Sequence, residues 1–172
     1  MGVVQNRAAA RRRTMIIGID GATFDLIRPW AEAGLLPTFQ RLMEQGAWGS
    51  LESTMPPVTP AAWSSLATGT KPGKHGLFDF FARSNGRYER TMVNATHRHG
   101  ASLWRLLSEA GVRTTVFNVP ATYPPEQGNG LMVSGLLTPN NADDASWPPE
   151  LLRELKQAVP DFSFYPPGIF SA

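Results

Sequence analysis

The sequence of 172 residues contains no cysteine. This absence excludes a disulfide framework and any metal site built from thiolates. A metal ion bound to this chain would have to be held by carboxylate, imidazole or hydroxyl groups. Three histidines and 14 acidic residues are the titratable side chains available for such a site.

Long hydrophobic runs are missing as well. No apolar stretch approaches the roughly 20 residues that a membrane-spanning helix needs. The apolar run MIIGI at 15–19 is too short for the core of a signal peptide. The sequence therefore predicts a cytoplasmic protein with no membrane partner.

The chain also has little excess charge of either sign. Its formal net charge is +2, and much of that comes from Arg7 and Arg11–Arg13 near the N-terminus. No basic face indicates a nucleic-acid partner. Residues 1–14 are small, polar and basic without periodicity, which predicts a disordered extension. Residues 15–172 are long enough to form one domain with a hydrophobic core.

Beyond residue 14, apolar runs alternate with amphipathic stretches. The continuous apolar run at 15–19 predicts a buried strand, and further strands are predicted at 47–53, 114–118 and 131–134. Amphipathic periodicity and end signals predict helices at 24–33, 37–46, 59–68, 101–110 and 148–159. Pro29 is expected to kink or break the first helix, and Asn85-Gly86 predicts a hairpin within 78–92. The alternation predicts an α/β fold whose sheet is largely parallel and has helices on both faces.

Two polar residues occupy positions where such folds bind ligands. Asp20 directly follows the first predicted strand, and Thr59 is the predicted N-cap of a helix whose first residue is Pro60. A helix N-terminus favours negative charge, with Ala61 and Ala62 as the predicted N–H donors. Asp20 could anchor a cation, and Thr59 could act as a nucleophile if a base or a metal activates it. A plain turn residue and a plain helix cap are the alternative interpretations.

Weaker candidates follow the Thr59 helix. Lys71, Lys74 and His75 could face a substrate phosphate, or could belong to a solvated loop. His97 and His99 form an H-x-H pair, but Arg98 between them favours an exposed loop. Three further features are interpreted structurally, as a solvated turn and two core residues: Asp143-Asp144, Trp63 and Trp104.

Several longer motifs carry a family resemblance. They are IIGIDGATFD, LPTFQRLMEQGA, PPVTPAAWSSLATGTKPGKHGLFDF, LWRLLSEAG, NVPATYPP and VSGLLTP. Through them the chain resembles the alkaline phosphatase superfamily, specifically its type I phosphodiesterase/nucleotide pyrophosphatase branch and the related predicted phosphohydrolase/phosphomutase proteins. The resemblance extends from Met15 to Pro139 and implies an alkaline-phosphatase-like fold.

The resemblance also implies roles for individual residues. Asp20 matches a metal ligand of the family, and Thr59 matches the nucleophile, which coordinates the same metal. The family uses two divalent metal ions, commonly zinc. The implied activity is metal-dependent hydrolysis of a small phosphoester. A phosphomutase, which needs the same nucleophile, stays open as an alternative. The sequence does not predict the oligomeric state.

The chain departs from the family pattern at two points. Phe80 stands where the nucleotide pyrophosphatase branch has a phosphate-contacting asparagine, which favours the phosphohydrolase branch. The later Asp and His ligands of the two-metal site have no counterpart, because His75, His97 and His99 lack the expected Asp-His pairing. We therefore expect residues 15–172 to be the N-terminal part of a longer domain, with a sheet incomplete at its C-terminal side, and to be inactive alone. The alternative is a non-catalytic half-domain that binds a phosphate-bearing ligand or partner.

Overall fold

The computed structural model describes residues 13–83 and 90–165. The chain divides into two compact units, Met1–Ser50 and Leu51–Ala172, which we describe separately. The predicted disordered extension lies almost wholly outside the described residues. Within the described part of the chain, no helix has the length and apolarity needed to cross a membrane.

The first unit contains two helices with local end signals. Helix α1 spans Phe24–Glu32, and the Thr23 side chain caps it by accepting a hydrogen bond from the Asp25 N–H. It continues through Pro29 instead of breaking there. Helix α2 spans Pro37–Gln45, with its proline at the first position, where the missing N–H has no helical partner to lose.

Two predicted strands of this region are not formed. Residues 15–19 and 47–53 have no regular secondary structure. Met15 is 82% exposed and Ile17 76% exposed. A strand needs hydrogen bonds from a neighbouring strand, and residues 13–50 contain no strand with which either run could pair. These two predictions were wrong because apolar composition alone does not supply a partner.

The second unit contains the remaining helices. They are α3 (Thr59–Thr68), α4 (Pro72–His75), the 3₁₀ turn η1 (Ala95–His97), α5 (Leu103–Glu109) and α6 (Glu150–Ala158). Gly69 ends α3 in the left-handed region at φ 63°, where glycine has no Cβ to clash. The N-cap of α3 is Val58, so Thr59 is the first helical residue and the predicted cap is shifted by one position.

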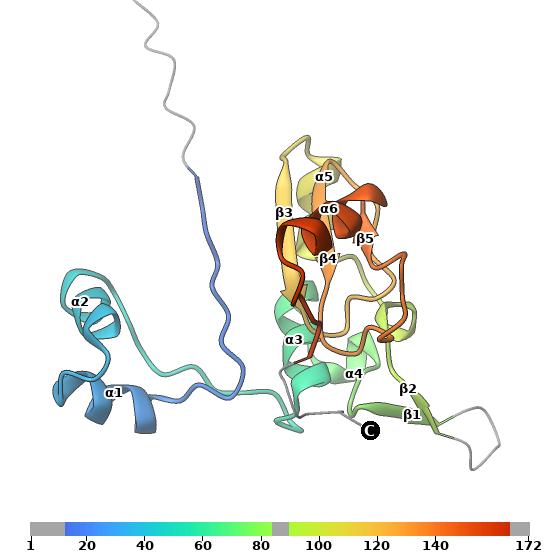
Figure 1. Cartoon of the computed structure of the whole chain (residues 1–172). Coiled ribbons are helices and arrows are strands. Elements are labelled where there is room, and N and C mark those ends of the chain that lie inside the picture. Colours follow the sequence, from blue (N-terminus) through green and yellow to red (C-terminus); the bar gives the residue numbers. More distant parts are fainter. Residues whose placement is uncertain (1–12, 84–89, 166–172) are drawn as a thin grey trace, which may run out of the picture. The chain divides into compact units, whose positions relative to one another are not determined.

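Two small sheets belong to this unit (Figure 1). Strands β1 (Phe81–Arg83) and β2 (Arg90–Met92) pair in antiparallel fashion, which confirms the hairpin, although its Asn85-Gly86 turn lies outside the described residues. The second sheet has the order β3 (Thr114–Val119), β4 (Gly130–Ser134), β5 (Ser146–Trp147). Its β3–β4 pair is parallel and its β4–β5 pair is antiparallel. The fold is therefore mixed α/β with small, partly antiparallel sheets, and the predicted largely parallel sheet is not seen.

Helices α5 and α6 cover opposite faces of this second sheet. Side chains alternate between the faces of a strand, so the register pairs Val116 with Met132 on one face and Phe117 with Val133 on the other. Val116 and Met132 line a cavity beside Trp104 of α5. On the opposite face, Val133 belongs to a core cluster with Leu152 of α6.

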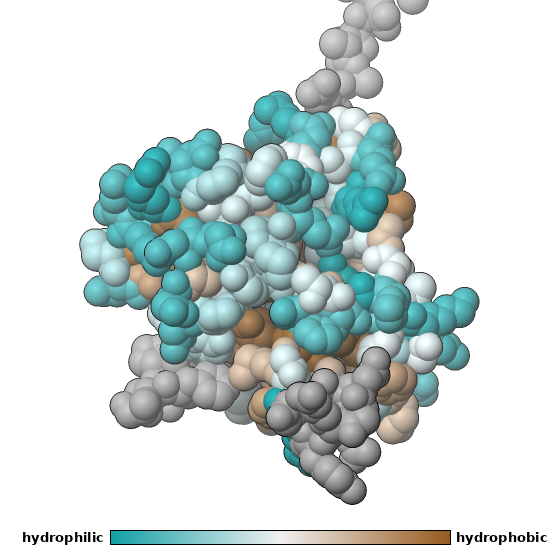
Figure 2. Space-filling model, turned by 90° about the vertical axis from the view of Figure 1, so that its right-hand side faces the viewer, coloured by the Kyte–Doolittle hydropathy of each residue, from teal (hydrophilic) through white to brown (hydrophobic). Residues whose placement is uncertain are grey.

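The second unit has two hydrophobic cores. The first comprises Val133, Ala142, Ala145, Leu152 and Phe164, with the rings of Phe162 and Phe164 in edge-to-face contact at 5.3 Å. The second comprises Leu77, Val93, Ala121 and Leu137, and Phe80 packs against it. In Figure 2, hydrophilic residues cover most of the face in view and apolar residues are visible between them.

Candidate functional site

Thr59 lies where the chain enters helix α3. Its side chain is half-buried, and extended backbone at Val58 (φ −118°, ψ 150°) precedes it. Pro60 follows as the second helical residue and contributes no N–H. The Ala62 N–H donates to the Val58 carbonyl at 3.0 Å, so Ala62 is not available as the anion donor that the sequence predicted. Ala61 is the other predicted donor, and it is fully buried.

Asp20 belongs to the first unit. It is exposed and forms a turn with Gly21, whose φ of 67° lies in the left-handed region. The turn includes a long hydrogen bond of 3.4 Å from the Ala22 N–H to the Ile19 carbonyl. The local geometry therefore presents a carboxylate at the end of an apolar segment, as expected, although that segment is not a strand.

The three weaker candidates have different environments. Lys71 and Lys74 are exposed, where each ammonium group can meet an anionic solute. His75 is fully buried, with 0% of its surface exposed. A side chain without exposed surface cannot touch a bound substrate, so the structure does not support the predicted substrate contact by His75.

The His75 ring is hydrogen bonded on both nitrogens. Its Nε2 lies 2.9 Å from Ser65 Oγ, and its Nδ1 accepts from the Leu77 N–H at 3.2 Å. Burial lowers the pKa of His75, an effect that a hydrogen bond with the Ala61 backbone opposes and the charge of Arg98 reinforces. The environment therefore favours the neutral imidazole.

Two of the other titratable side chains, His97 and Asp144, have structural partners. His97 Nδ1 lies 2.9 Å from Asn94 Oδ1 and accepts from the Asn94 N–H at 3.2 Å, in the 3₁₀ turn. Asp144 accepts from the Tyr123 hydroxyl at 2.9 Å. Over residues 13–83 and 90–165, no group of three or more His, Asp or Glu side chains is arranged to hold a metal ion.

A buried ion pair is the main polar feature that the sequence did not reveal. Arg98 Nη2 donates to Glu126, and the Arg98 side chain is 4% exposed. The second carboxylate oxygen of Glu126 accepts from Ser102 Oγ at 2.9 Å. Ser102 also caps α5 by accepting from the Arg105 N–H at 3.2 Å. A serine before a helix is a recognisable cap signal, but nothing local to Glu126 indicates its partners 24 and 28 residues away.

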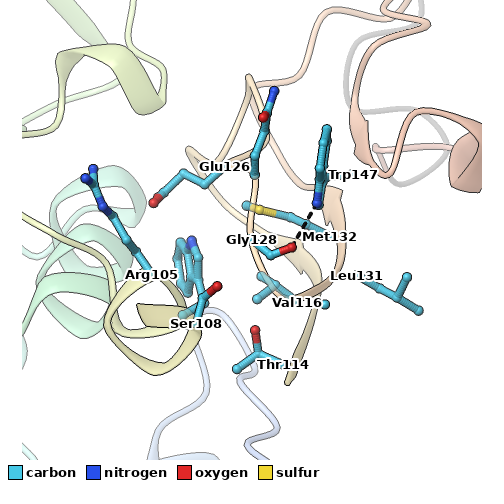
Figure 3. A pocket seen from close by; sticks show the side chains of 12 residues that line it. Arg105, Ser108, Thr114, Val116, Glu126, Gly128, Leu131, Met132 and Trp147 are labelled. Atoms are coloured by element: carbon cyan, nitrogen blue, oxygen red, sulfur yellow. Dashed lines mark hydrogen bonds between the residues drawn. The ribbon is translucent and has the colours of Figure 1, made fainter. Parts of the chain in front are cut away.

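Two cavities of the second unit are not lined by Thr59. A small one of about 20 Å³, next to α5, is lined by Val116, Met132 and Trp147 among others (Figure 3). There the Trp147 Nε1 donates to the Gly128 carbonyl at 3.0 Å, the dashed line of Figure 3. This volume suits a water molecule and is far below that of a typical ligand site. Neither this cavity nor the open one lined by Arg105, Ser108, Glu109, Glu126 and Gln127 includes Thr59.

Comparison with known proteins gives one positive result. The family model described as type I phosphodiesterase / nucleotide pyrophosphatase matches residues 14–165. No curated protein and no solved structure matches the chain. The matched range is most of the sequence and includes Asp20, Thr59 and the loop with Lys71, Lys74 and His75.

Proposed function

Because the chain belongs to the type I phosphodiesterase / nucleotide pyrophosphatase family, we propose that it carries the nucleophile of a phosphoester hydrolase, and that Thr59 is this nucleophile. The observation that carries the proposal is the place of Thr59 as the first residue of α3, inside the matched range. The positive end of a helix dipole favours an anionic substrate and the charge that develops on it.

In the proposed reaction, Thr59 Oγ forms a bond to phosphorus as the bond from phosphorus to the leaving oxygen breaks. The hydroxyl proton passes to solvent, and water then hydrolyses the phosphothreonine and frees the hydroxyl. Lys71 and Lys74, both exposed, attract the anionic substrate towards this part of the unit. The substrate class is a small phosphoester, and a nucleotide fits the description of the family.

The family resemblance gives Asp20 the role of a metal ligand and adds two divalent ions, commonly zinc. The described residues do not fit a complete site of this kind, because they include no group of three or more suitable side chains. We propose that further ligands come from outside the described residues. We propose that the 172-residue chain alone does not turn over substrate, since its described residues include no cluster of side chains that could hold the activating metal ions.

A second candidate is favoured by the same observation. A module that binds a phosphate-bearing ligand or partner without turnover needs the helix N-terminus and the lysines, but no metal cluster. A phosphomutase shares the nucleophile and differs in the acceptor to which the phosphoryl group is returned.

The test compares the 172-residue chain with the product of the full reading frame that contains it. Both are assayed with zinc and bis(p-nitrophenyl) phosphate, and Thr59→Ala and Thr59→Ser serve as paired variants. We expect no turnover by the 172-residue chain, and turnover by the full product that Thr59→Ala lowers at least about 1000-fold without loss of bound zinc. Turnover retained in Thr59→Ala would exclude the nucleophile role. A full product that binds inorganic phosphate but hydrolyses nothing would identify the binding module.

A further inference from the structure

His75 is a buried imidazole that the proposed reaction does not use. It is the last residue of the short helix α4, and its side chain is 0% exposed although Lys71 and Lys74 beside it are exposed. Its carbonyl accepts from the His99 N–H at 2.9 Å. Both its main chain and its ring are therefore held inside the unit.

The hydrogen bonds select one form of the ring. The Leu77 N–H donates to Nδ1 at 3.2 Å, and a nitrogen that accepts carries no proton. The proton of the neutral ring is therefore on Nε2, which lies 2.9 Å from Ser65 Oγ and donates to it. The Ala61 backbone lies close enough to this ring to raise its pKa, against the effect of burial. The ring has no nitrogen left for a metal or a substrate.

These contacts reach helix α3, whose first residue is Thr59. Ser65 and Ala61 both belong to α3, and Ala61 is two residues after Thr59. The residue at the N-cap position of this helix is Val58, whose apolar side chain cannot accept a hydrogen bond from the first turn. The first turn is instead contacted from its buried side. At the opposite side of the ring, Leu77 is 1% exposed in the second core cluster.

We propose that His75 is a positioning residue for Thr59, connecting the first turn of α3 to the second core cluster through one tautomer of its ring. This inference rests on the proposed role of Thr59 as the nucleophile. Small displacements of a reacting group cost large factors in rate, because the reacting atoms have to lie close together and aligned. The contact with Ser65 is the side-chain hydrogen bond to α3, which a substitution can remove, and the contact with Leu77 fixes the ring.

Two isosteric variants separate these contacts. In His75→Gln the amide nitrogen replaces Nε2 and keeps a donor for Ser65, whereas in His75→Asn the amide oxygen replaces Nδ1 and keeps only the acceptor for Leu77. In the full gene product we expect His75→Asn and Ser65→Ala to lower kcat about 10- to 100-fold with KM within about twofold. His75→Gln retains most of kcat, and the exposed His99→Gln is the matched control. Equal losses in His75→Gln and His75→Asn, or no loss in Ser65→Ala, would overturn the proposal.

A second measurement uses the 172-residue chain and does not depend on its enzymatic activity. The Ala62 N–H, bonded to the Val58 carbonyl at 3.0 Å, closes the first turn of α3, and its hydrogen exchange is measured by NMR. We expect faster exchange in His75→Asn and Ser65→Ala, and unchanged exchange in His75→Gln and His99→Gln. Unchanged exchange in all four variants would overturn the positioning role. If Thr59→Ala retains turnover, the nucleophile proposal fails, while the exchange data still decide whether His75 holds this turn.

Discussion

The two units use similar residues with different results. Among residues 13–50, the one buried side chain is that of Ala31, and large apolar residues such as Ile17 and Leu35 are 76% and 69% exposed. The second unit has two hydrophobic cores, in which Leu77 and Leu152 are 1% and 2% exposed. Both units form helices, but within the described residues only the second forms strands.

The difference shows which structures a short segment can form by itself. A helix closes its hydrogen bonds within its own residues, so α1 and α2 form with little burial. A strand depends on a neighbour. Strands were predicted at both 15–19 and 114–118, but only the second segment is paired, with β4.

The largest expected effect separates the two units by burial. Leu152→Ala should lower the free energy of unfolding of the second unit by about 2–5 kcal/mol, because it leaves a cavity in the first core cluster. The matched Leu35→Ala should change the free energy of unfolding of the first unit by less than about 0.5 kcal/mol. Urea unfolding followed by circular dichroism measures both. Similar losses in the two variants would show that Leu35 is buried in solution.

The next effect compares ion pairs. Glu126→Gln leaves the buried guanidinium of Arg98 without its countercharge, and we expect a loss of about 1–3 kcal/mol. Glu126 is itself 25% exposed, which moderates the loss. In the first unit, Glu32→Gln removes a surface ion pair with Arg28. The Arg28 side chain is 57% exposed and that of Glu32 is 71% exposed, so the loss in free energy of unfolding should be less than about 0.5 kcal/mol. Equal costs, measured by urea unfolding, would contradict this comparison.

A pH dependence should also belong to the second unit, which contains all three histidines. Burial lowers the pKa of His75 below the ordinary 6.5, so the unfolded state binds its proton more readily. The stabilisation is complete above pH 6.5 and is lost as the pH falls towards the lowered value. The urea midpoint of the second unit should therefore be lower at pH 5.5 than at pH 7.5. His75→Gln should reduce this slope, and a slope unchanged from the wild type would exclude His75 as its source.

The smallest expected effect concerns a helix cap. Thr23→Ala removes the side chain that accepts from the Asp25 N–H at 3.3 Å, and should destabilise α1 by about 0.5–1 kcal/mol. Because the effect is confined to the first unit, the urea midpoint of the second should not move. Amide exchange in α1 detects the change. Ser102→Ala, which removes the buried cap of α5 and a partner of Glu126, should instead lower that midpoint.

Helices were predictable from the sequence because their ends are marked locally. Pro37 begins α2 and Gly69 follows α3, as predicted. The N-cap of α3 was predicted one residue too late. Threonine is a residue type that favours the N-cap, whereas the extended backbone at Val58 is not marked in the sequence. The absence of a strand at 15–19 was not predictable, since it depends on pairing and not on composition.

The candidate site was predictable only in part. Thr59 lies at a helix start, as expected, and Lys71 and Lys74 are exposed. The burial of His75 could not be read from a loop rich in Lys, Gly and Pro, because it depends on Leu77, Ser65 and the second core cluster around them. Roles in catalysis depend on groups that are distant in sequence, and local patterns do not contain that information.

The exposure of Leu51 has a practical consequence. Leu51 is 96% exposed, and residues 47–54 have no helix or strand. Accessible, irregular segments of this kind are preferred sites of proteolytic cleavage. A protease that cuts after large apolar residues should nick the chain at Leu51 and release a fragment that begins at Glu52 and retains both hydrophobic cores. Limited digestion would thus prepare the second unit by itself, without redesign of its gene.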